Sequence, residues 1–436
     1  MAKISQITFS FKELEKKDDL ERLKLTLDYF PDEQLMHVLE IERKNGRNDY
    51  PIRFLWNVLI AGIVFQHQSI NSLIRELNRN PTLREICGLG PLKKVPKAYV
   101  FTRFLKKLMH HYDLVEKIFN QLIQIIQKEL PDFGKDLSGD GKAIQTLAAP
   151  NKNNNKLKPD GRRDTEANFG VKKYSGIDEK GKVWEQLKSW FGYRAHIIAD
   201  SKYELPIAFE VTKASLSENK ELKTLLIKLK IINPEIIDRC NYMSLDRGYD
   251  DEEIIKKLWD DYRIKPIIDI RNMWKDKDKT RVLPNTDNIV YNYRGTISCY
   301  CPVSVEMKEM AYAGFEKDRR TLKYRCPCQA YGIACKGEKK CKFRKGLRIK
   351  IDSNRRLFTP LPRSSYKWKD KYNSRTSIER LNSRIDEFFG FEKHYYRGLK
   401  KIKLRLCLSF ITMLSMALGR IKQKEFEKIR SMVKAA

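Results

Sequence analysis

The chain of 436 residues lacks an apolar run long enough to cross a membrane. A spanning helix needs about 20 consecutive apolar residues, and the best candidate, Leu406–Gly419, is shorter and suits a buried helix. The first residues hold no apolar segment followed by a cleavage site, so we expect no signal peptide. These absences argue against a membrane partner.

The sequence also lacks the evenly spread, even-numbered cysteines of a secreted disulfide framework. It has nine cysteines, and six of them lie between residues 299 and 341. We expect the three outside this region, Cys87, Cys240 and Cys407, to be small buried hydrophobic residues. This usage favours a reducing, cytoplasmic compartment.

Acidic residues are scarce relative to basic ones: 56 Asp and Glu stand against 87 Lys and Arg, a formal net charge of +31. Such an excess exceeds what solubility requires and favours a polyanionic partner, above all nucleic acid. The hydrophobic share of 41% excludes wholesale disorder.

Composition and periodicity divide the chain into four parts. Residues 1–130 are predicted to be helical, either as a DNA-binding domain or as an ordinary helical bundle. Residues 131–270 alternate strands and helices, which predicts an α/β core with a mixed sheet, within a multidomain α+β and α/β fold. Residues 271–350 form a basic, cysteine-rich insertion, and residues 351–436 return to helices, with one helix expected over 374–389 and another from residue 399 to the C-terminus.

Three carboxylates lie where a nuclease would need them. Asp140 lies between two glycines at the end of a strand predicted over residues 136–144, and Asp246 directly follows an apolar strand at 242–245. Glu379 lies on a predicted helix, on one face with Tyr372, Arg375 and Asp386. Taken singly, these acids also fit a turn, a helix cap and a surface Arg–Glu pair. We expect Asp250 to cap the helix that follows it.

Acids of this kind beside a basic surface fit phosphodiester cleavage. Two Mg²⁺ ions held by a few carboxylates can activate an attacking oxygen and stabilise the leaving oxygen.

Together, the three acids resemble those of the DDE transposases of bacterial insertion sequences, in the IS-four-like group with a ribonuclease-H-like catalytic core. Tyr372, Arg375 and Glu379 match the Tyr-x-x-Arg-x-x-x-Glu part of the family's signature at the correct spacing. The signature ends in a Lys seven residues after the Glu, and this chain has Asp386 there. The hairpin predicted over residues 192–211 resembles the family's second and third strands.

The resemblance implies a metal-dependent transposase with Asp140, Asp246 and Glu379 as the catalytic and metal-binding triad. Mg²⁺ or Mn²⁺ would be the cofactor, and residues 131–270 and 351–436 would form the ribonuclease-H-like core. The expected partners are double-stranded DNA, as terminal inverted repeats and target, and a second copy of the chain. The expected location is the bacterial nucleoid. We assign DNA contacts to Tyr372, Arg375, Arg247 and Lys142.

Two alternatives remain open from the sequence. One is a non-catalytic DNA-binding protein derived from a transposase, and the other is a metal-dependent nuclease that cuts DNA without joining it.

The insertion carries the clustered cysteines and a net charge of +12, from 20 Lys and Arg against 8 Asp and Glu in residues 271–350. Zinc favours four thiolates, so the cluster predicts a possible zinc module whose hydrophobic core would otherwise be too small. Free thiols in a small basic insertion are the alternative. The possible ligands are Cys299, Cys301, Cys326, Cys328, Cys335 and Cys341.

Overall fold

A computed structural model describes residues 18–44, 49–90, 93–150, 164–177, 183–276, 278–392 and 394–431. The chain forms two compact units. The first comprises Met1–Glu129, Thr146–Thr165 and Ser383–Ala436, and the second comprises Leu130–Gln145 and Glu166–Asn382. Most of the polar loop predicted at residues 151–164 lies outside the described residues.

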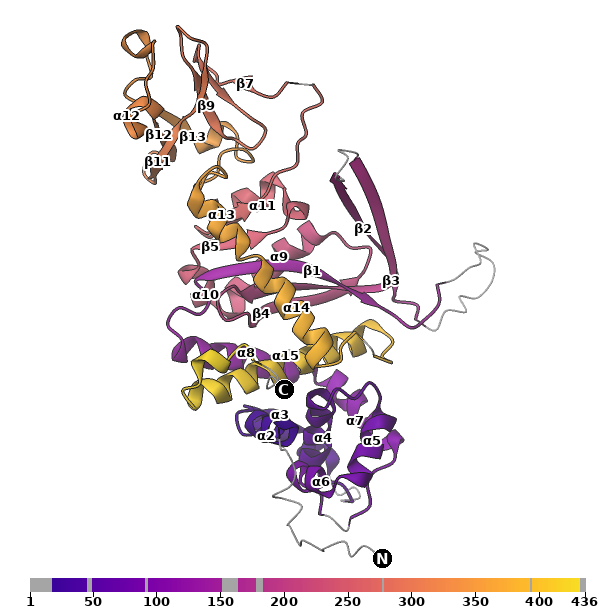
Figure 1. Cartoon of the computed structure of the whole chain (residues 1–436). Coiled ribbons are helices and arrows are strands. Elements are labelled where there is room, and N and C mark those ends of the chain that lie inside the picture. The colour runs from indigo at the N-terminus through magenta and orange to yellow at the C-terminus, as the bar shows by residue number, and fades with distance from the viewer. Residues whose placement is uncertain are drawn as a thin grey trace, which may run out of the picture. The chain divides into compact units, whose positions relative to one another are not determined.

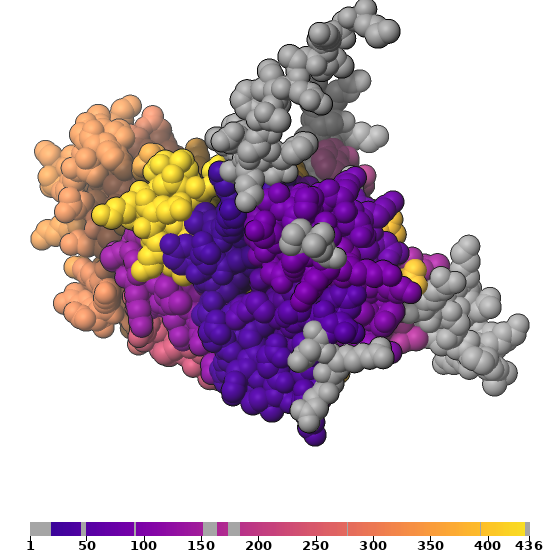
Figure 2. Space-filling view, turned by 90° about the horizontal axis from the view of Figure 1, so that it is seen from below, coloured from indigo at the N-terminus to yellow at the C-terminus, as the bar shows by residue number. Residues whose placement is uncertain are grey.

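The first unit is helical, and its N-terminal helices form the indigo and purple surface in Figure 2. Local sequence sets several boundaries: the Ser69 hydroxyl accepts a hydrogen bond from the Ser72 N–H, and the Asn80 side chain accepts one from the Leu83 N–H at 2.9 Å, so each caps a helix. Its helices are α2 (Asp18–Leu27), α3 (Glu33–Arg43), α4 (Ile52–Val64), α5 (Ile70–Arg79), α6 (Pro81–Cys87), α7 (Ala98–His110), α8 (Tyr112–Glu129) and α15 (Leu399–Lys422), with the short η5 (Phe426–Lys428).

The central helix of this unit is α15, which is long and apolar enough to pass as a membrane span by length and composition. Of its apolar window, 94% is buried inside the structure. It packs against α8, α2 and α4 of the same unit. The apolar surface of α15 is therefore core, as the sequence predicted for Leu406–Gly419.

The second unit is built on a curled, six-stranded mixed sheet. β3 pairs antiparallel with β1 and β4, whereas β1, β5 and β6 run parallel to one another. The strand order is β2-β3-β1-β5-β6, with β4 also beside β3. The strands are β1 (Asp136–Gln145), β2 (Asn168–Ile177), β3 (Val183–Asp200), β4 (Pro206–Lys213), β5 (Tyr242–Leu245) and β6 (Lys265–Ile268).

Helices cover this sheet, and in Figure 1 the pair α13–α14 runs diagonally across β1. α9 packs on β3 and β4, and α13 packs on β5 and β6. The covering elements are α9 (Glu218–Ile232), α10 (Pro234–Arg239), η1 (Arg247–Tyr249), α11 (Glu252–Lys256), η2 (Lys257–Asp261), α13 (Tyr366–Asn373) and α14 (Thr376–Phe388).

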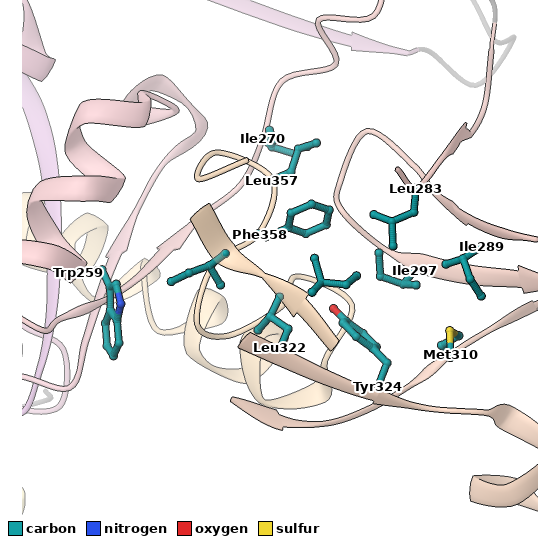
Figure 3. Packing of buried hydrophobic residues seen from close by; sticks show 12 residues of the cluster. Trp259, Ile270, Leu283, Ile289, Ile297, Met310, Leu322, Tyr324, Leu357 and Phe358 are labelled. Atoms are coloured by element: carbon teal, nitrogen blue, oxygen red, sulfur yellow. The ribbon is translucent and has the colours of Figure 1, made fainter. Parts of the chain in front are cut away.

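The insertion folds into two small antiparallel sheets around a hydrophobic cluster, shown in Figure 3 with Trp259 at one end. Ile289, Ile297 and Ile351 in this cluster are fully buried. The expectation that the whole insertion lacks a sufficient core is therefore wrong. Its elements are β7 (Arg281–Val282), β8 (Ile289–Tyr291), β9 (Ile297–Tyr300), β10 (Met307–Glu309), β11 (Ala311–Glu316), β12 (Thr321–Arg325), α12 (Pro327–Tyr331), η3 (Glu338–Lys340), β13 (Leu347–Lys350) and η4 (Ile351–Ser353).

Three elements differ from the sequence prediction. The helix expected over 374–389 is confirmed as α14, but a separate helix that was not predicted, α13, precedes it and ends at Asn373. Tyr372 therefore belongs to a different helix from Glu379. The last long helix ends at Lys422, and the helix after Asp250 continues from α11 into the π-helical turn η2.

One strand also differs from the prediction: β3 is longer, and its first half pairs with the unpredicted β2. Figure 1 shows these segments rising from the sheet as a hairpin, called here the β2–β3 arm (residues 168–177 and 183–191). The pairing partner of β3 changes from β2 to β1 at Gly192, whose φ of 155° suits glycine. The arm was missed because exposed side chains such as Val171 and Leu187 give it no alternation of buried and polar positions.

A buried histidine predicts how acid affects the stability of the second unit. His196 on β3 is 2% exposed, and its Nε2 lies 2.9 Å from the Thr212 hydroxyl oxygen. Burial, reinforced by Arg194, lowers the pKa of His196 from 6.5 to about 4. Between these values the unfolded chain binds a proton that the folded chain does not. The free energy of unfolding therefore falls as the pH drops, by about 1.4 kcal/mol per pH unit.

We expect His196→Gln to lose less stability than the wild type between pH 7 and pH 5, by up to about 2 kcal/mol. Urea unfolding at the two pH values measures this difference. His37→Gln, at an exposed position of α3, is the control and should lose as much as the wild type. Equal losses in all three proteins would contradict the assignment.

Candidate active site

The register of two parallel strands places the first two acids side by side. Gly139 of β1 pairs with Leu245 of β5, so the next residues, Asp140 and Asp246, occupy equivalent positions on neighbouring strands. Such strands lie about 4.8 Å apart. Asp246 also accepts a hydrogen bond from the Gly248 N–H at 2.8 Å, so it caps the turn η1 while remaining next to Asp140.

Hydrogen bonds across the sheet hold the helix pair that carries the third acid. The Ser377 and Ser138 hydroxyl oxygens lie 2.5 Å apart, and the Ser244 hydroxyl donates to the Lys371 carbonyl at 2.9 Å. The Lys371 ammonium lies 2.6 Å from a carboxylate oxygen of Asp136 at the start of β1. These contacts fix α13 and the start of α14 against β1 and β5.

Glu379 lies one turn into α14 and is 51% exposed. Its carboxylate accepts a hydrogen bond from Arg375 Nη1 at 2.7 Å. Burial raises the pKa of Asp140, and the charge of Arg375 opposes that rise. Arg375 therefore contacts the third acid by a hydrogen bond and acts on Asp140 through its charge.

Burial and crowding dominate the electrostatics of the paired acids. Burial is the main cause that raises the pKa of Asp140, and Asp246 raises it further. Lys172 opposes this rise from 3.7 Å, and its ammonium donates to the Gly141 carbonyl at 2.9 Å. Crowded, partly buried carboxylates favour the binding of a cation.

A fourth acid, Glu218, was not predicted from the sequence. It is the first residue of α9 and is 16% exposed, and its Oε1 would lie 2.6 Å from a Cβ placed on Gly141. Arg194 Nη1 lies 3.2 Å from the same oxygen, and the Lys172 ammonium lies 4.0 Å away. Burial raises the pKa of Glu218, and the charges of Asp140 and Asp246 add to the rise. The one sequence signal for Glu218 is its position at the start of the helix that follows the β3–β4 hairpin.

The residues assigned to DNA contact occupy different environments. Lys142 lies two residues after Asp140 on β1, and hence on the same face of the strand. Tyr372 is partly buried and stacks on Trp368 at 4.7 Å between ring centroids. Arg247 is 59% exposed and forms an ion pair with Asp269.

The prediction that Asp250 caps the helix after it is wrong, because Asp250 does not cap α11. The cap is Asp251, which accepts hydrogen bonds from the N–H groups of Glu253 and Ile254. The side chain of Asp250 is 1% exposed and pairs with Arg356 at 2.6 Å and 3.0 Å. Asp250 therefore ties α11 to the segment after the insertion.

The six clustered cysteines come together. They line one cavity of about 20 Å³, together with residues of β9, β10 and the segment that follows β12. Cys87, Cys240 and Cys407 are buried, as predicted.

The donor set around Asp140 and Asp246 fits a divalent cation. Carboxylate oxygens are the ligands that Mg²⁺ prefers, and it needs only a few of them because it keeps several waters. The ammonium of Lys172, beside Asp140, balances part of the negative charge of the two acids.

Two family models match the sequence. Residues 164–415 match a model described as transposase DDE domain, and residues 9–107 match one described as transposase domain (DUF772). The first match covers more than half of the chain, so the chain belongs to the transposase DDE domain family. Its function is therefore transposition, and it acts on DNA. The match includes Asp246 and Glu379, whereas Asp140 precedes it.

Among solved structures, the cryo-EM structure of the piggyBac transposase synaptic complex with hairpin DNA is similar at 12% identity and a TM-score of 0.38. The similarity covers 95% of this chain and 78% of that one. No curated protein matches the sequence significantly. The family generally uses divalent metal ions for nuclease and transesterification chemistry.

Glu218 provides a test of the electrostatics at this site. If its charge helps to hold a cation near Asp140, Glu218→Gln should weaken Mn²⁺ binding roughly tenfold, which is about 1.4 kcal/mol. Isothermal titration of the DNA-free protein with Mn²⁺ measures this. Glu221→Gln, one turn along α9, is the matched control and should bind as the wild type does. Unchanged affinity in Glu218→Gln would restrict Glu218 to pairing with Arg194 and Lys172.

Proposed function

We propose that this transposase cleaves DNA at the ends of an insertion sequence and joins the freed ends to target DNA, using Asp140, Asp246 and Glu379. The observation that carries the proposal is the parallel register that aligns Asp140 with Asp246. The Arg375–Glu379 pair on the adjoining helix, at 2.7 Å, adds the third acid of the family signature.

The proposed cofactor of the triad is Mg²⁺, or Mn²⁺. When bound, the metal ions would activate the attacking oxygen and offset the charge on the leaving oxygen. A zinc ion at the cysteine cluster would have a structural role and would take no part in cleavage.

The chain's own residues would position the phosphate. Arg375, 23% exposed beside Glu379, can offer its guanidinium to the phosphodiester as a bidentate clamp. The guanidinium carbon of Arg375 lies 5.8 Å from the centre of the Tyr372 ring, which is stacked on Trp368. This contact limits the orientations that the guanidinium can adopt. Lys142 and Arg247 would bind phosphates next to the scissile one.

The reaction would proceed in two displacements at phosphorus. In the first, water attacks the phosphodiester at the end of the element, the P–O3′ bond breaks, and a 3′-hydroxyl is released. In the second, that hydroxyl attacks a target phosphodiester, forming a new P–O bond as the target strand's 3′-oxygen leaves. Neither step needs a covalent bond to the protein.

A ribonuclease-H-like core in the IS-four-like group is the proposed fold family. Its support is the order of the sheet, in which the antiparallel strands β1, β3 and β4 precede the parallel strands β5 and β6. The hairpin formed by β3 and β4 occupies the place that the resemblance assigns to the second and third strands.

The proposed partners follow from charge and family. We propose that the helices before Glu129 bind the terminal inverted repeats and that two copies of the chain act on a pair of ends. A net charge of +31 supports a DNA partner. The bacterial nucleoid is the proposed location.

Isosteric variants of the three acids test the proposal. Asp140→Asn, Asp246→Asn and Glu379→Gln should each reduce Mg²⁺-dependent nicking at least a hundredfold, because each removes a negative ligand from the metal site. Binding of the same DNA should change less than threefold. The substrate is a labelled duplex carrying the inverted repeats found in the DNA that flanks the gene.

Acids of the same unit outside the site serve as controls. Asp238→Asn on α10, 65% exposed, and Glu253→Gln on α11, 80% exposed, should cleave as the wild type does. Nicking retained in Asp246→Asn would disprove the triad. Tight binding without cleavage by the wild type would favour the non-catalytic alternative, and cleavage without joining would favour the nuclease.

A further inference from the structure

The segment between β12 and β13 has almost no core of its own. It runs over residues 326–346, and only Cys326, Pro327 and Gly337 are buried there. Its regular structure is limited to α12 and the single turn η3. It also carries six basic residues against Glu338, so mutual repulsion opposes its compaction. A connection this long without a core needs another source of stability.

Four of the six clustered cysteines lie in this segment. Of the other two, Cys299 is in β9 and Cys301 directly follows it. Cys301 Sγ and Cys335 Sγ are 3.6 Å apart. Two thiolates on one tetrahedral zinc, at about 2.3 Å each, lie roughly 3.8 Å apart. The thiol of Cys328 interacts with those of Cys335 and Cys326, so the chain of contacts runs 301–335–328–326.

The turn that follows Cys301 donates a hydrogen bond to its sulfur. The Ser304 N–H donates to Cys301 Sγ at 3.4 Å, and the turn is closed by the Val305 N–H, which donates to the Cys301 carbonyl at 2.9 Å. Hydrogen bonds of this kind stabilise the charged form, which is the form that binds metal.

The two remaining cysteines have different surroundings. Cys299 packs against the hydrophobic cluster of the insertion, and its thiol also interacts with those of Cys326, Cys335 and Cys341. Cys341 lies 3.8 Å from the side-chain amide of Asn288. All six are free thiols in the structure.

The six thiol groups are not arranged as a tetrahedron in the structure. Among the described residues, the one set of three ligand groups lying within 4.8 Å of one another is Glu42, His110 and His111, on the other compact unit. Binding would therefore draw Cys326 and Cys328 toward the Cys301–Cys335 pair. Because their segment is exposed and has few buried contacts, this movement disrupts little packing.

We propose that the transposase binds one structural zinc ion through Cys301, Cys335, Cys326 and Cys328, with Cys299 and Cys341 as non-ligands. The ion fastens residues 326–346 to the end of β9. It takes the place of the missing core and offsets half of the charge of the four thiolates. The proposal does not depend on the catalytic assignment, because none of these residues belongs to the triad.

Zinc analysis of the full chain, purified under reducing conditions, tests the proposal. We expect one zinc per chain in the wild type and less than 0.2 in Cys301→Ser and Cys335→Ser, as an order-of-magnitude loss. Replacement by Co²⁺ should give the d–d bands of a tetrahedral site and a thiolate charge-transfer band. Trypsin should cut the apo form and the two variants at least ten times faster than the zinc form, at the lysines of residues 336–342.

The remaining cysteines supply matched controls. Cys299→Ser, Cys341→Ser and the distant Cys240→Ser should each keep one zinc and the tryptic protection. Two zinc ions per chain, or loss of zinc in Cys341→Ser, would overturn the four-ligand assignment. A reduced wild-type protein without zinc or a cobalt–thiolate band would overturn the site itself, and so would disulfide bonds among these six cysteines in the protein purified without reductant.

Discussion

The parallel pairing of β1 with β5 is the constraint on which the candidate site depends. It aligns Asp140, in the middle of β1, with Asp246, just after the end of β5, where partial burial makes their mutual repulsion costly. Cations approach this point from three elements: Lys172 from β2, Arg194 from β3, and Arg375 from the junction of α13 and α14. Much of the surrounding architecture, including the serine contacts between β1 and α14, keeps these groups in place.

Much of the sheet could be predicted, because its signals are local. The apolar runs at 242–245 and 193–200 and the acids that follow or neighbour them are visible in the printed sequence, and β1, β4 and β5 lie where the pattern put them. The spacing of Arg375 and Glu379 likewise gave a pair that the structure contains. In each case a few adjacent residues carry the information.

The parts that could not be predicted depend on distant partners. Asp250 has the local pattern of a helix cap, yet its partner is Arg356 on the far side of the insertion, and only the tertiary fold brings the two together. Glu218 joins the site from the start of α9, and Lys172 joins it from the β2–β3 arm, whose exposed side chains give no periodic signal. Likewise, the hydroxyl of Ser377 on α14 contacts that of Ser138 on β1, a residue 239 positions away in the sequence.

The position of Lys172 on the β2–β3 arm has a consequence for the charged ligands of the site. The β2–β3 arm delivers the ammonium of Lys172 to 3.7 Å from Asp140, so this lysine serves as an internal counterion. Anything that displaces it must bring positive charge of its own, as a divalent cation does, because the acids would otherwise be left uncompensated. The position of the β2–β3 arm thereby sets part of the charge that a cation meets at Asp140.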